Sequence, residues 1–155
     1  MQNYIYQAGP VFTEAERMWH KNLTLQLERA GFSVIWPGTL FPAEAVDATG
    51  EAAPGFIFLG CKETLDHSGC VVALLDGAQV SDGTAWEIGY AYAKGLPIYG
   101  LRTDIRQSGD TKTNRINSMI EGCLTGFTDN IPDLIEMLSR NKSVSELAAE
   151  AGRRG

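Results

Sequence analysis

The sequence predicts an α/β fold in which a doubly wound, five-stranded, mostly parallel sheet carries helices on both faces. Strand-like and helix-like segments alternate four or five times along the chain, which implies right-handed crossovers between parallel strands. The run from Cys70 to Leu75 (CVVALL) is continuously apolar, as expected for a central strand buried on both faces. The 155 residues suffice for one domain with its own core, and we expect that domain to span 1–140.

The first strand and the first helix have clear boundaries in the sequence. Gln2 to Ala8 alternates as a strand does and ends at the turn signal Gly9-Pro10. Thr13 and Glu16 have the spacing of a capping box, which predicts a helix from Thr13 to about Ala30. Apolar residues at steps of three and four predict a core-facing stripe on this helix: Ala15, Met18, Trp19, Leu23, Leu27 and Ala30.

A second strand and a long irregular segment follow this helix. Gly31 is a typical C-terminal cap, and Phe32 to Trp36 has the composition of a strand. Pro37 to Gly55 shows little periodicity. We expect a loop that folds over something, because structureless stretches of this length are usually functional or disordered. Phe56 to His67 has a helical pattern and leads to the buried strand described above.

The second half of the chain repeats the alternation. Asp82 is predicted to cap a helix that reaches Lys94 and stops at Gly95. The remaining predicted elements are a strand at Leu96–Leu101, a polar loop at Arg102–Asn114, a short helix near Ile116–Gly122, a last helix at Ile131–Arg140 and a polar tail at Asn141–Gly155. In a Rossmann- or flavodoxin-like sheet, ligands bind beyond the carboxyl ends of the strands. Four segments are therefore expected around one cleft: Ala8–Phe12, Pro37–Phe41, Asp76–Asp82 and Arg102–Arg106.

The composition narrows the class of partner. The formal charge of −6 argues against nucleic acid and anionic membranes, because polyanions require a basic patch, whereas a small neutral ligand is compatible with it. The chain has no apolar run of membrane-spanning length and no signal-like start, so we expect a cytoplasmic protein. Three cysteines without a CxxC pair and two isolated histidines predict neither a disulfide framework nor a metal site. Nothing in the sequence calls for a cofactor.

The helix after the buried strand carries the most chemical information. Glu87 lies in its second turn with no cation among its neighbours at three and four positions, which are Gly83, Thr84, Tyr90 and Ala91. Burial raises the pKa of such a carboxylate, whereas the positive end of the helix favours its anion. A poorly solvated anion suits a nucleophile that attacks an electron-poor sugar carbon. The residues alone leave open a second interpretation, in which Glu87 lies at the helix rim and contacts water.

The segment Asp82–Ala93 (DGTAWEIGYAYA) resembles the signature of the nucleoside 2-deoxyribosyltransferase family. In that signature an acidic or small residue and a Gly precede a Glu-[Ile/Leu]-Gly-Tyr-Ala core. Three further segments are similar to the family's opening strand and loop, its third strand and a late interface helix: Ile5–Phe12, Val71–Gly77 and Asn117–Ile120. The four motifs keep the family's order and spacing from residue 4 to about 140, so the resemblance covers the predicted domain.

The resemblance implies a double displacement. Glu87 would attack the anomeric carbon of a nucleoside and expel the base, and a second base or water would then take up the sugar. Tyr6 would orient the Glu87 carboxylate, while Asp82 and Asn117, the latter from a neighbouring subunit, would hold the sugar 5′-hydroxyl. Further substrate contacts are implied for Gly9, Phe12, Cys61 and Met119, and Trp36 is a further candidate for the base pocket.

From the residues alone, several of these side chains have a structural alternative. The alternative for Tyr6 is a strand tyrosine packed in the core, and that for Asp82 is a plain helix cap, a role compatible with substrate binding. Asn117 is equally an exposed residue at a helix start. Phe12 and Trp36 are compatible with ordinary core aromatics.

Two departures from the family pattern bear on the substrate. Where the family has an Asp, less often Asn, that protonates the leaving base, ungapped alignment places Cys61, whose thiol is a weak donor. Asp66, one turn further along, replaces it only if the helix is shifted. Related nucleoside 5′-monophosphate glycosidases have an Arg- and Gly-rich loop where this chain has Gly9-Pro10-Val11-Phe12, and a Ser where it has Asp82. Because Asp82 would repel a 5′-phosphate, we expect a nucleoside and not a nucleotide.

Three functions remain open on the sequence. The leading one is a nucleoside 2-deoxyribosyltransferase, and the second is an N-glycosidase that passes the sugar from the same Glu87 to water. The third is a non-catalytic nucleoside-binding module, for which Cys61 is the best argument. Because the family shares active sites across subunits, the resemblance also implies a homo-oligomer that binds a nucleoside and a nucleobase.

Overall fold

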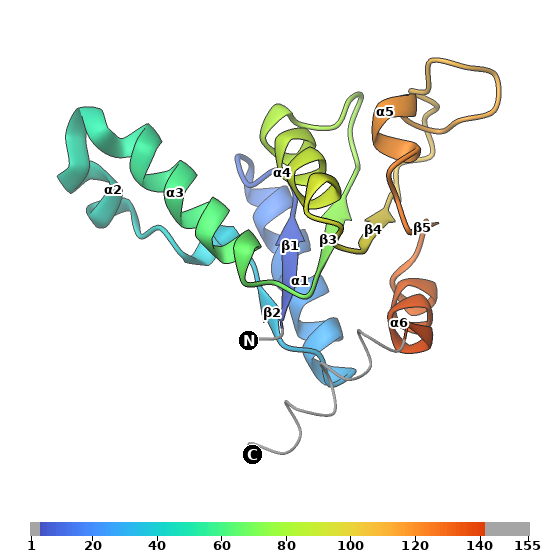
Figure 1. The fold of residues 1–155 in the computed structure, drawn as a ribbon, viewed down its shortest axis with the longest axis horizontal. Helices are drawn as coiled ribbons and strands as arrows, with labels where there is room; N and C mark the ends of the chain where they lie inside the picture. The colour runs from blue at the N-terminus through green and yellow to red at the C-terminus, as the bar shows by residue number, and fades with distance from the viewer. Residues whose placement is uncertain (1–3, 142–155) are drawn as a thin grey trace.

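The computed structural model describes residues 4–141, and in this part of the chain five strands form one sheet. The strands are β1 (Ile5–Ala8), β2 (Val34–Ile35), β3 (Cys70–Leu74), β4 (Ile98–Leu101) and β5 (Gly126–Thr128). Their order is β2-β1-β3-β4-β5, and all four pairings are parallel (Figure 1). The predicted doubly wound α/β fold is confirmed. The strand order reverses between β1 and β3, and ligands bind at such reversals in this class of fold.

Helices cover both faces of the sheet. They are α1 (Glu14–Arg29), α2 (Ala43–Thr49), α3 (Ala53–Asp66), α4 (Asp82–Ala93), α5 (Ser118–Glu121) and α6 (Ile131–Arg140). Helices α1 and α6 bury leucines against one face, while α3 and α4 bury Leu65, Ile88 and Ala91 against the other. No helix within residues 4–141 is both long enough and apolar enough to cross a membrane.

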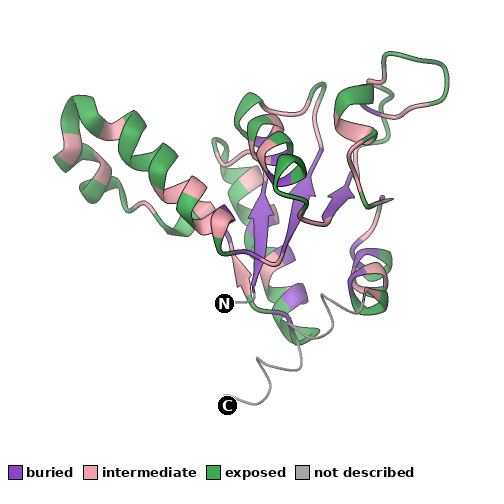
Figure 2. Cartoon of the chain, in the orientation of Figure 1, coloured by how far each residue is buried: buried purple, intermediate pink, exposed green. Residues whose placement is uncertain are grey.

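Strand β1 serves both layers of the core, because successive side chains of a strand point to opposite faces. Ile5 joins the cluster under α1 and α6, whereas Tyr6 and Ala8 join the cluster under α3 and α4. The burial colouring shows this central part of the sheet as the most buried region of the molecule (Figure 2). The alternation therefore directs Tyr6 toward α4, the helix that carries Glu87.

Helix α1 begins as predicted. The Thr13 hydroxyl accepts a hydrogen bond from the Glu16 amide at 3.2 Å, and the Thr13 amide donates to the Glu16 carboxylate at 2.7 Å. This reciprocal pair satisfies two amides that the first helical turn leaves unpaired. The boundaries read from the capping box are thus correct to within a residue.

The predicted core-facing stripe of α1 is only partly right. Leu23 and Leu27 are fully buried, but the structure exposes three predicted members, Ala15, Met18 and Ala30. His20 is buried instead, a polar residue that an apolar pattern passes over. Its burial is accommodated because the Gln7 amide bonds its Nδ1 at 2.9 Å and the Trp36 ring stacks on it at 5.2 Å.

The segment 37–55 is not the loop that the sequence predicts. It contains a 3₁₀ turn at Pro37–Thr39, helix α2, a second 3₁₀ turn at Gly50–Ala52 and the start of α3. Prolines and glycines conceal these short helices from a periodicity argument. Pro42 immediately precedes α2 and Pro54 lies in the first turn of α3, positions that proline tolerates. In Figure 1, α2 and α3 form an arm that extends away from the sheet.

The C-terminal third contains the edge of the sheet. Strand β5 has three residues, too few for any alternation to show in the sequence, and no sequence signal placed it. Helix α5 covers four residues and is shorter than the predicted 116–122, because Asn117 forms its N-cap and Ile116 lies before it. Helix α6 has the predicted bounds. Apart from Asn141, the predicted tail lies outside the described residues, and the domain boundary at 140 stays a prediction.

Candidate active site

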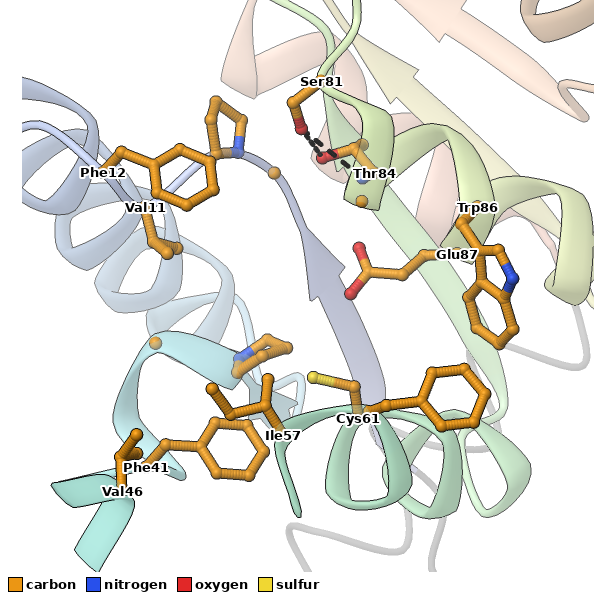
Figure 3. A pocket seen from close by; sticks show the side chains of 16 residues that line it. Val11, Phe12, Phe41, Val46, Ile57, Cys61, Ser81, Thr84, Trp86 and Glu87 are labelled. Carbon is orange, nitrogen blue, oxygen red and sulfur yellow. Dashed lines mark hydrogen bonds between the residues drawn. The ribbon is translucent and has the colours of Figure 1, made fainter. Parts of the chain in front are cut away.

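A pocket of about 460 Å³ opens beyond the carboxyl end of β1, between the loop after that strand, the α2–α3 arm and α4 (Figure 3). Its lining consists of Gly9, Pro10, Val11, Phe12, Pro37, Gly38, Phe41, Val46, Ile57, Phe58, Cys61, Ser81, Gly83, Thr84, Trp86 and Glu87. Three of the four segments expected around the cleft contribute to it. The fourth, 102–106, does not, and the expectation for it was wrong.

Arg102 explains why that segment lies elsewhere. Its side chain is fully buried, and its guanidinium donates to the carbonyls of Leu75 and Gly77 at 2.5 and 3.0 Å. Asp76 accepts further hydrogen bonds from the backbone and hydroxyl of Thr103 at 2.6 and 2.5 Å. The loop after β4 is therefore tied to the loop after β3 and lines no part of the pocket.

Glu87 extends from α4 into the pocket, where its carboxylate accepts a hydrogen bond from the Tyr6 hydroxyl at 2.5 Å. Tyr6 comes from β1 and is fully buried, so the position of its hydroxyl is determined by the sheet. Burial raises the pKa of Glu87 to about 7, and the hydrogen bond from Tyr6 opposes this rise by favouring the anion. Burial and the neighbouring carboxylate both raise the pKa of Tyr6, which therefore stays a neutral donor.

The N-terminus of α4 forms the rim of the pocket next to Glu87. Its N-cap is Ser81, whose hydroxyl accepts from the Thr84 amide at 3.4 Å and bonds the Thr84 hydroxyl at 2.7 Å. The prediction that Asp82 caps this helix was wrong, because Asp82 is its first residue. The Asp82 side chain is exposed, accepts from the Gly83 amide at 2.8 Å and does not line the pocket.

Cys61 lines the pocket from α3, on the side opposite the α4 rim (Figure 3). Its thiol interacts with the Tyr6 hydroxyl and lies near Glu87. Burial and the carboxylate raise the pKa of the thiol. Asp66, considered as its substitute, faces away from the pocket: its carboxylate pairs with Lys62 at 2.8 Å and with Lys94. The helix shift that would bring Asp66 into the site is absent.

The loop after β1 forms a further wall of the pocket through Gly9 and Phe12. Gly9 has φ = +154°, and a Cβ there would lie 2.5 Å from Cε1 of the buried His20. The Arg17 guanidinium donates to the carbonyls of Val11 and Phe12, both at 3.0 Å, and so anchors this loop to α1. Phe12 lines the pocket with its side chain 76% exposed.

Besides Asp82, and Tyr6, which contacts Glu87 without lining the pocket, three further predicted residues do not line the pocket of this chain. Asn117 and Met119 belong to α5, where the Asn117 side chain caps the helix by accepting from the Met119 amide at 2.9 Å. Met119 is 82% exposed. Trp36 is only 5% exposed and stacks on His20, so its proposed place in the base pocket was wrong. Its ring instead lies against the backbone of Gly38, where a Cβ would approach it to 2.4 Å.

Comparison with known proteins bears on the chemistry of this pocket. The sequence pattern of the family described as "Nucleoside 2-deoxyribosyltransferase" matches residues 5–119, most of the chain. The chain belongs to this family. The match includes β1, the α2–α3 arm and α4, which are the elements that build the pocket. The description of this family names a transferase, which supports an enzyme.

Solved structures support the same fold. A conserved protein of Enterococcus faecalis V583 is 27% identical, with a TM-score of 0.75, over 94% of this chain and 99% of that chain. A 2-deoxyribosyltransferase of Bacillus psychrosaccharolyticus is 22% identical, with a TM-score of 0.67, over 85% and 90% of the chains. A CMP N-glycosidase of Clostridium botulinum is 18% identical, with a TM-score of 0.55, over 88% and 98%. The second and third structures share the fold with this chain, and similarity at these identities indicates nothing beyond the fold. No curated protein matches the sequence.

Sequence reasoning missed several residues of the deoxyribosyltransferase-family pocket. They are Val46, Ile57, Phe58, Thr84 and Trp86. A signal existed for two of them, because Ile57 and Phe58 lie four and three positions before Cys61 and so share its helix face. Another existed for Thr84, three positions before Glu87. Val46 had none, since α2 was not predicted.

Proposed function

We propose that this chain is a nucleoside 2-deoxyribosyltransferase that forms a covalent deoxyribosyl intermediate on Glu87. One observation carries the proposal: the carboxylate of Glu87 lies in the pocket, poorly solvated, with the buried Tyr6 hydroxyl 2.5 Å from one oxygen. A pKa of about 7 leaves a substantial fraction ionised near neutral pH, while the poor solvation keeps the anion reactive.

The reaction proceeds in two displacements at the anomeric carbon. A carboxylate oxygen of Glu87 forms a bond to C1′ as the bond from C1′ to the base nitrogen breaks, and the base departs with that electron pair. A nitrogen of a second base then attacks C1′ and releases the carboxylate. Tyr6 donates to Glu87 throughout and holds its orientation.

The sugar end of the substrate is assigned to the rim of the pocket. In the proposal, Asp82 and a neighbouring subunit's Asn117 hold the 5′-hydroxyl, and Met119 accompanies Asn117 across the interface. Asp82 is the second residue of this rim, adjacent to the lining residues Ser81 and Gly83. Its exposed carboxylate at the start of α4 disfavours a 5′-phosphate by like charge, which supports a nucleoside over a nucleotide.

An N-glycosidase that transfers the sugar to water is the second candidate function. Cys61 favours hydrolysis, because a site that recognises a second base poorly leaves water as the acceptor of the sugar. The chemistry up to the Glu87 intermediate is the same in both. A module that binds nucleosides without turning them over is the third. The cytoplasmic location expected from the composition stays a prediction.

A single assay separates the three functions. Deoxyinosine is incubated with excess adenine and the products are followed by chromatography. Transfer yields deoxyadenosine, hydrolysis yields free deoxyribose, and a binding module yields neither. Glu87→Gln keeps the size of the side chain and its acceptor for Tyr6 but removes the nucleophile, so it is expected to lower the rate at least 10³-fold. Glu28→Gln on the exposed end of α1 is the matched control and should retain the full rate. Full activity in Glu87→Gln would overturn the assignment.

A further inference from the structure

The wall of the pocket lacks positively charged side chains. Among the sixteen lining residues, which all lie within the described part of the chain, the ionisable side chains are Glu87 and Cys61. None of these residues is a Lys, Arg or His. The nearby cations Lys62 and Lys94 pair with Asp66 outside the pocket. Among these lining residues a ligand therefore meets the carboxylate of Glu87 and no positive side chain.

The same wall contains only weak proton donors for a departing base. When the bond from C1′ to a neutral base breaks, the electron pair leaves the base as an anion unless a proton arrives. The Cys61 thiol is a weak acid whose pKa is raised further by burial. The hydroxyls of Ser81 and Thr84 bond each other and are far weaker acids. Asn117 and Met119, proposed to come from a neighbouring subunit, are an amide and a thioether and supply no acid.

Aromatic rings make up much of the remaining wall. Phe12, Phe41, Phe58 and Trp86 all line the pocket, and Phe58 packs edge-on against Trp86 with ring centroids 5.1 Å apart. The faces of such rings attract cations, and the attraction is strongest where water is excluded. Figure 3 shows Phe12 and Phe41 across the cavity from the Glu87 carboxylate, so aromatic side chains and the carboxylate border one space.

We infer that the preferred substrates are nucleosides whose base carries a fixed positive charge, such as N7-alkylated purine nucleosides. This inference rests on the proposed function and narrows it to a substrate class. A quaternised base needs no proton to leave. As the bond from C1′ to N9 breaks, its electron pair neutralises the charge of the ring, the base departs neutral, and Glu87 takes up C1′. The aromatic wall and the Glu87 carboxylate attract the cation before the reaction.

The test compares 2′-deoxyguanosine with 7-methyl-2′-deoxyguanosine, which differ by one methyl group and one charge. The assay uses a slightly acidic buffer in which the methylated base stays cationic, and rates without enzyme are subtracted. The kcat/KM of the wild-type protein should be at least about 100-fold higher for the methylated nucleoside, because general acid catalysis contributes 10²–10⁴-fold where it is present. Glu87→Gln should lose activity on both substrates.

Variants at Cys61 test whether the lack of a proton donor causes the difference in kcat/KM between the two nucleosides. Cys61→Asp introduces a carboxyl at the base, so kcat/KM for 2′-deoxyguanosine should rise about tenfold or more and the ratio between the substrates should narrow. Cys61→Ser is the matched control. It keeps a small polar side chain without acidity in this range, and the ratio should stay wide. Thermal melts of both variants check that they are folded.

The outcomes separate the substrate class from the proposed function. Activity on both nucleosides within tenfold of each other, lost in Glu87→Gln, would overturn the cationic class and leave the deoxyribosyltransferase proposal intact. A wide wild-type ratio supports the class even if Cys61→Asp does not fold. A wide ratio that a folded Cys61→Asp fails to narrow would overturn the role given to the missing acid. No turnover of either nucleoside, together with no transfer from deoxyinosine, would overturn both proposals.

Discussion

At the scale of single residues, the proposed chemistry depends on the contact between Glu87 and Tyr6. The two residues are 81 positions apart, and β1 and α4 bring the hydroxyl within 2.5 Å of the carboxylate. Burial raises the pKa of Glu87 well above its usual value. The hydrogen bond from Tyr6 favours the anion and so opposes part of this rise. The charge state of the proposed nucleophile therefore depends on two opposing effects, burial on α4 and the hydrogen bond from β1.

Removing the Tyr6 hydroxyl shifts this balance. Tyr6→Phe takes away the donor that favours the anion, so the pKa of Glu87 should rise above about 7. Because only the ionised carboxylate attacks, kcat/KM rises with pH through this pKa, and in the variant the rise should move to higher pH. The rate at neutral pH should fall about tenfold or more. A pH–rate profile measures both changes.

A matched control distinguishes this effect from simple loss of packing. Tyr4→Phe removes a tyrosine hydroxyl two residues earlier in the chain, where it donates to the carbonyl of Thr64 at 2.7 Å. It should change stability without moving the pH–rate profile. An unshifted profile in Tyr6→Phe would show that Tyr6 is a core residue without influence on Glu87.

At the scale of elements, the pocket depends on how closely the loop after β1 approaches α1. Gly9 permits this approach, since its backbone conformation disfavours a side chain and its missing Cβ leaves room for His20. His20 in turn is held by Gln7 of β1 and by Trp36, which follows β2, so three segments of the chain meet near this glycine. The position of Phe12 at the pocket wall follows from this packing.

Substitution of Gly9 tests that dependence. Gly9→Ala should lower the free energy of unfolding by about 1–3 kcal/mol, because the added methyl overlaps His20. Chemical denaturation measures the change. Gly89→Ala is the control, since a Cβ on this helical glycine meets nothing within 4 Å. That substitution should stabilise α4 by up to about 1 kcal/mol. Equal effects of the two substitutions would contradict the packing argument.

At the scale of the whole molecule, a single chain does not complete the proposed site. Asn117 lies on α5 and does not line the pocket that contains Glu87. Apolar side chains are also exposed on α3 and α4, among them Leu59 at 63% and Tyr92 at 63%. Both observations support the proposed homo-oligomer, in which a neighbour supplies Asn117 and Met119.

Mixing two inactive variants tests the sharing of sites. Glu87→Gln and Asn117→Ala each disable every site in a pure oligomer. In a mixed oligomer some sites combine an intact Glu87 with an intact Asn117 from the neighbour. Co-refolded mixtures should therefore recover a fraction of the wild-type rate, on the order of one quarter for pairwise sites with random assembly. Sedimentation checks the assembly. A monomer at micromolar concentration, or no recovery in the mixture, would contradict shared sites.

Local patterns were sufficient for part of this protein. The capping box at Thr13, the buried run from Cys70 and the last helix are all in place, because hydrogen bonds and apolar periodicity within a few residues determine such elements. The same reasoning marked Glu87 as a carboxylate without a cationic neighbour. Prediction failed where local signals are short or conflicting, as in α2 and β5.

The sequence by itself determined the α/β fold, the family and the segment that holds Glu87. Only the tertiary structure decided which side chains meet Glu87, because contacts between distant segments depend on strand order and helix packing. It left Cys61 in the pocket and Asp66 outside it, where Asp66 forms ion pairs with Lys62 of α3 and with Lys94, the C-cap of α4. It also placed α2 and the aromatic wall around the carboxylate, which no local pattern encodes.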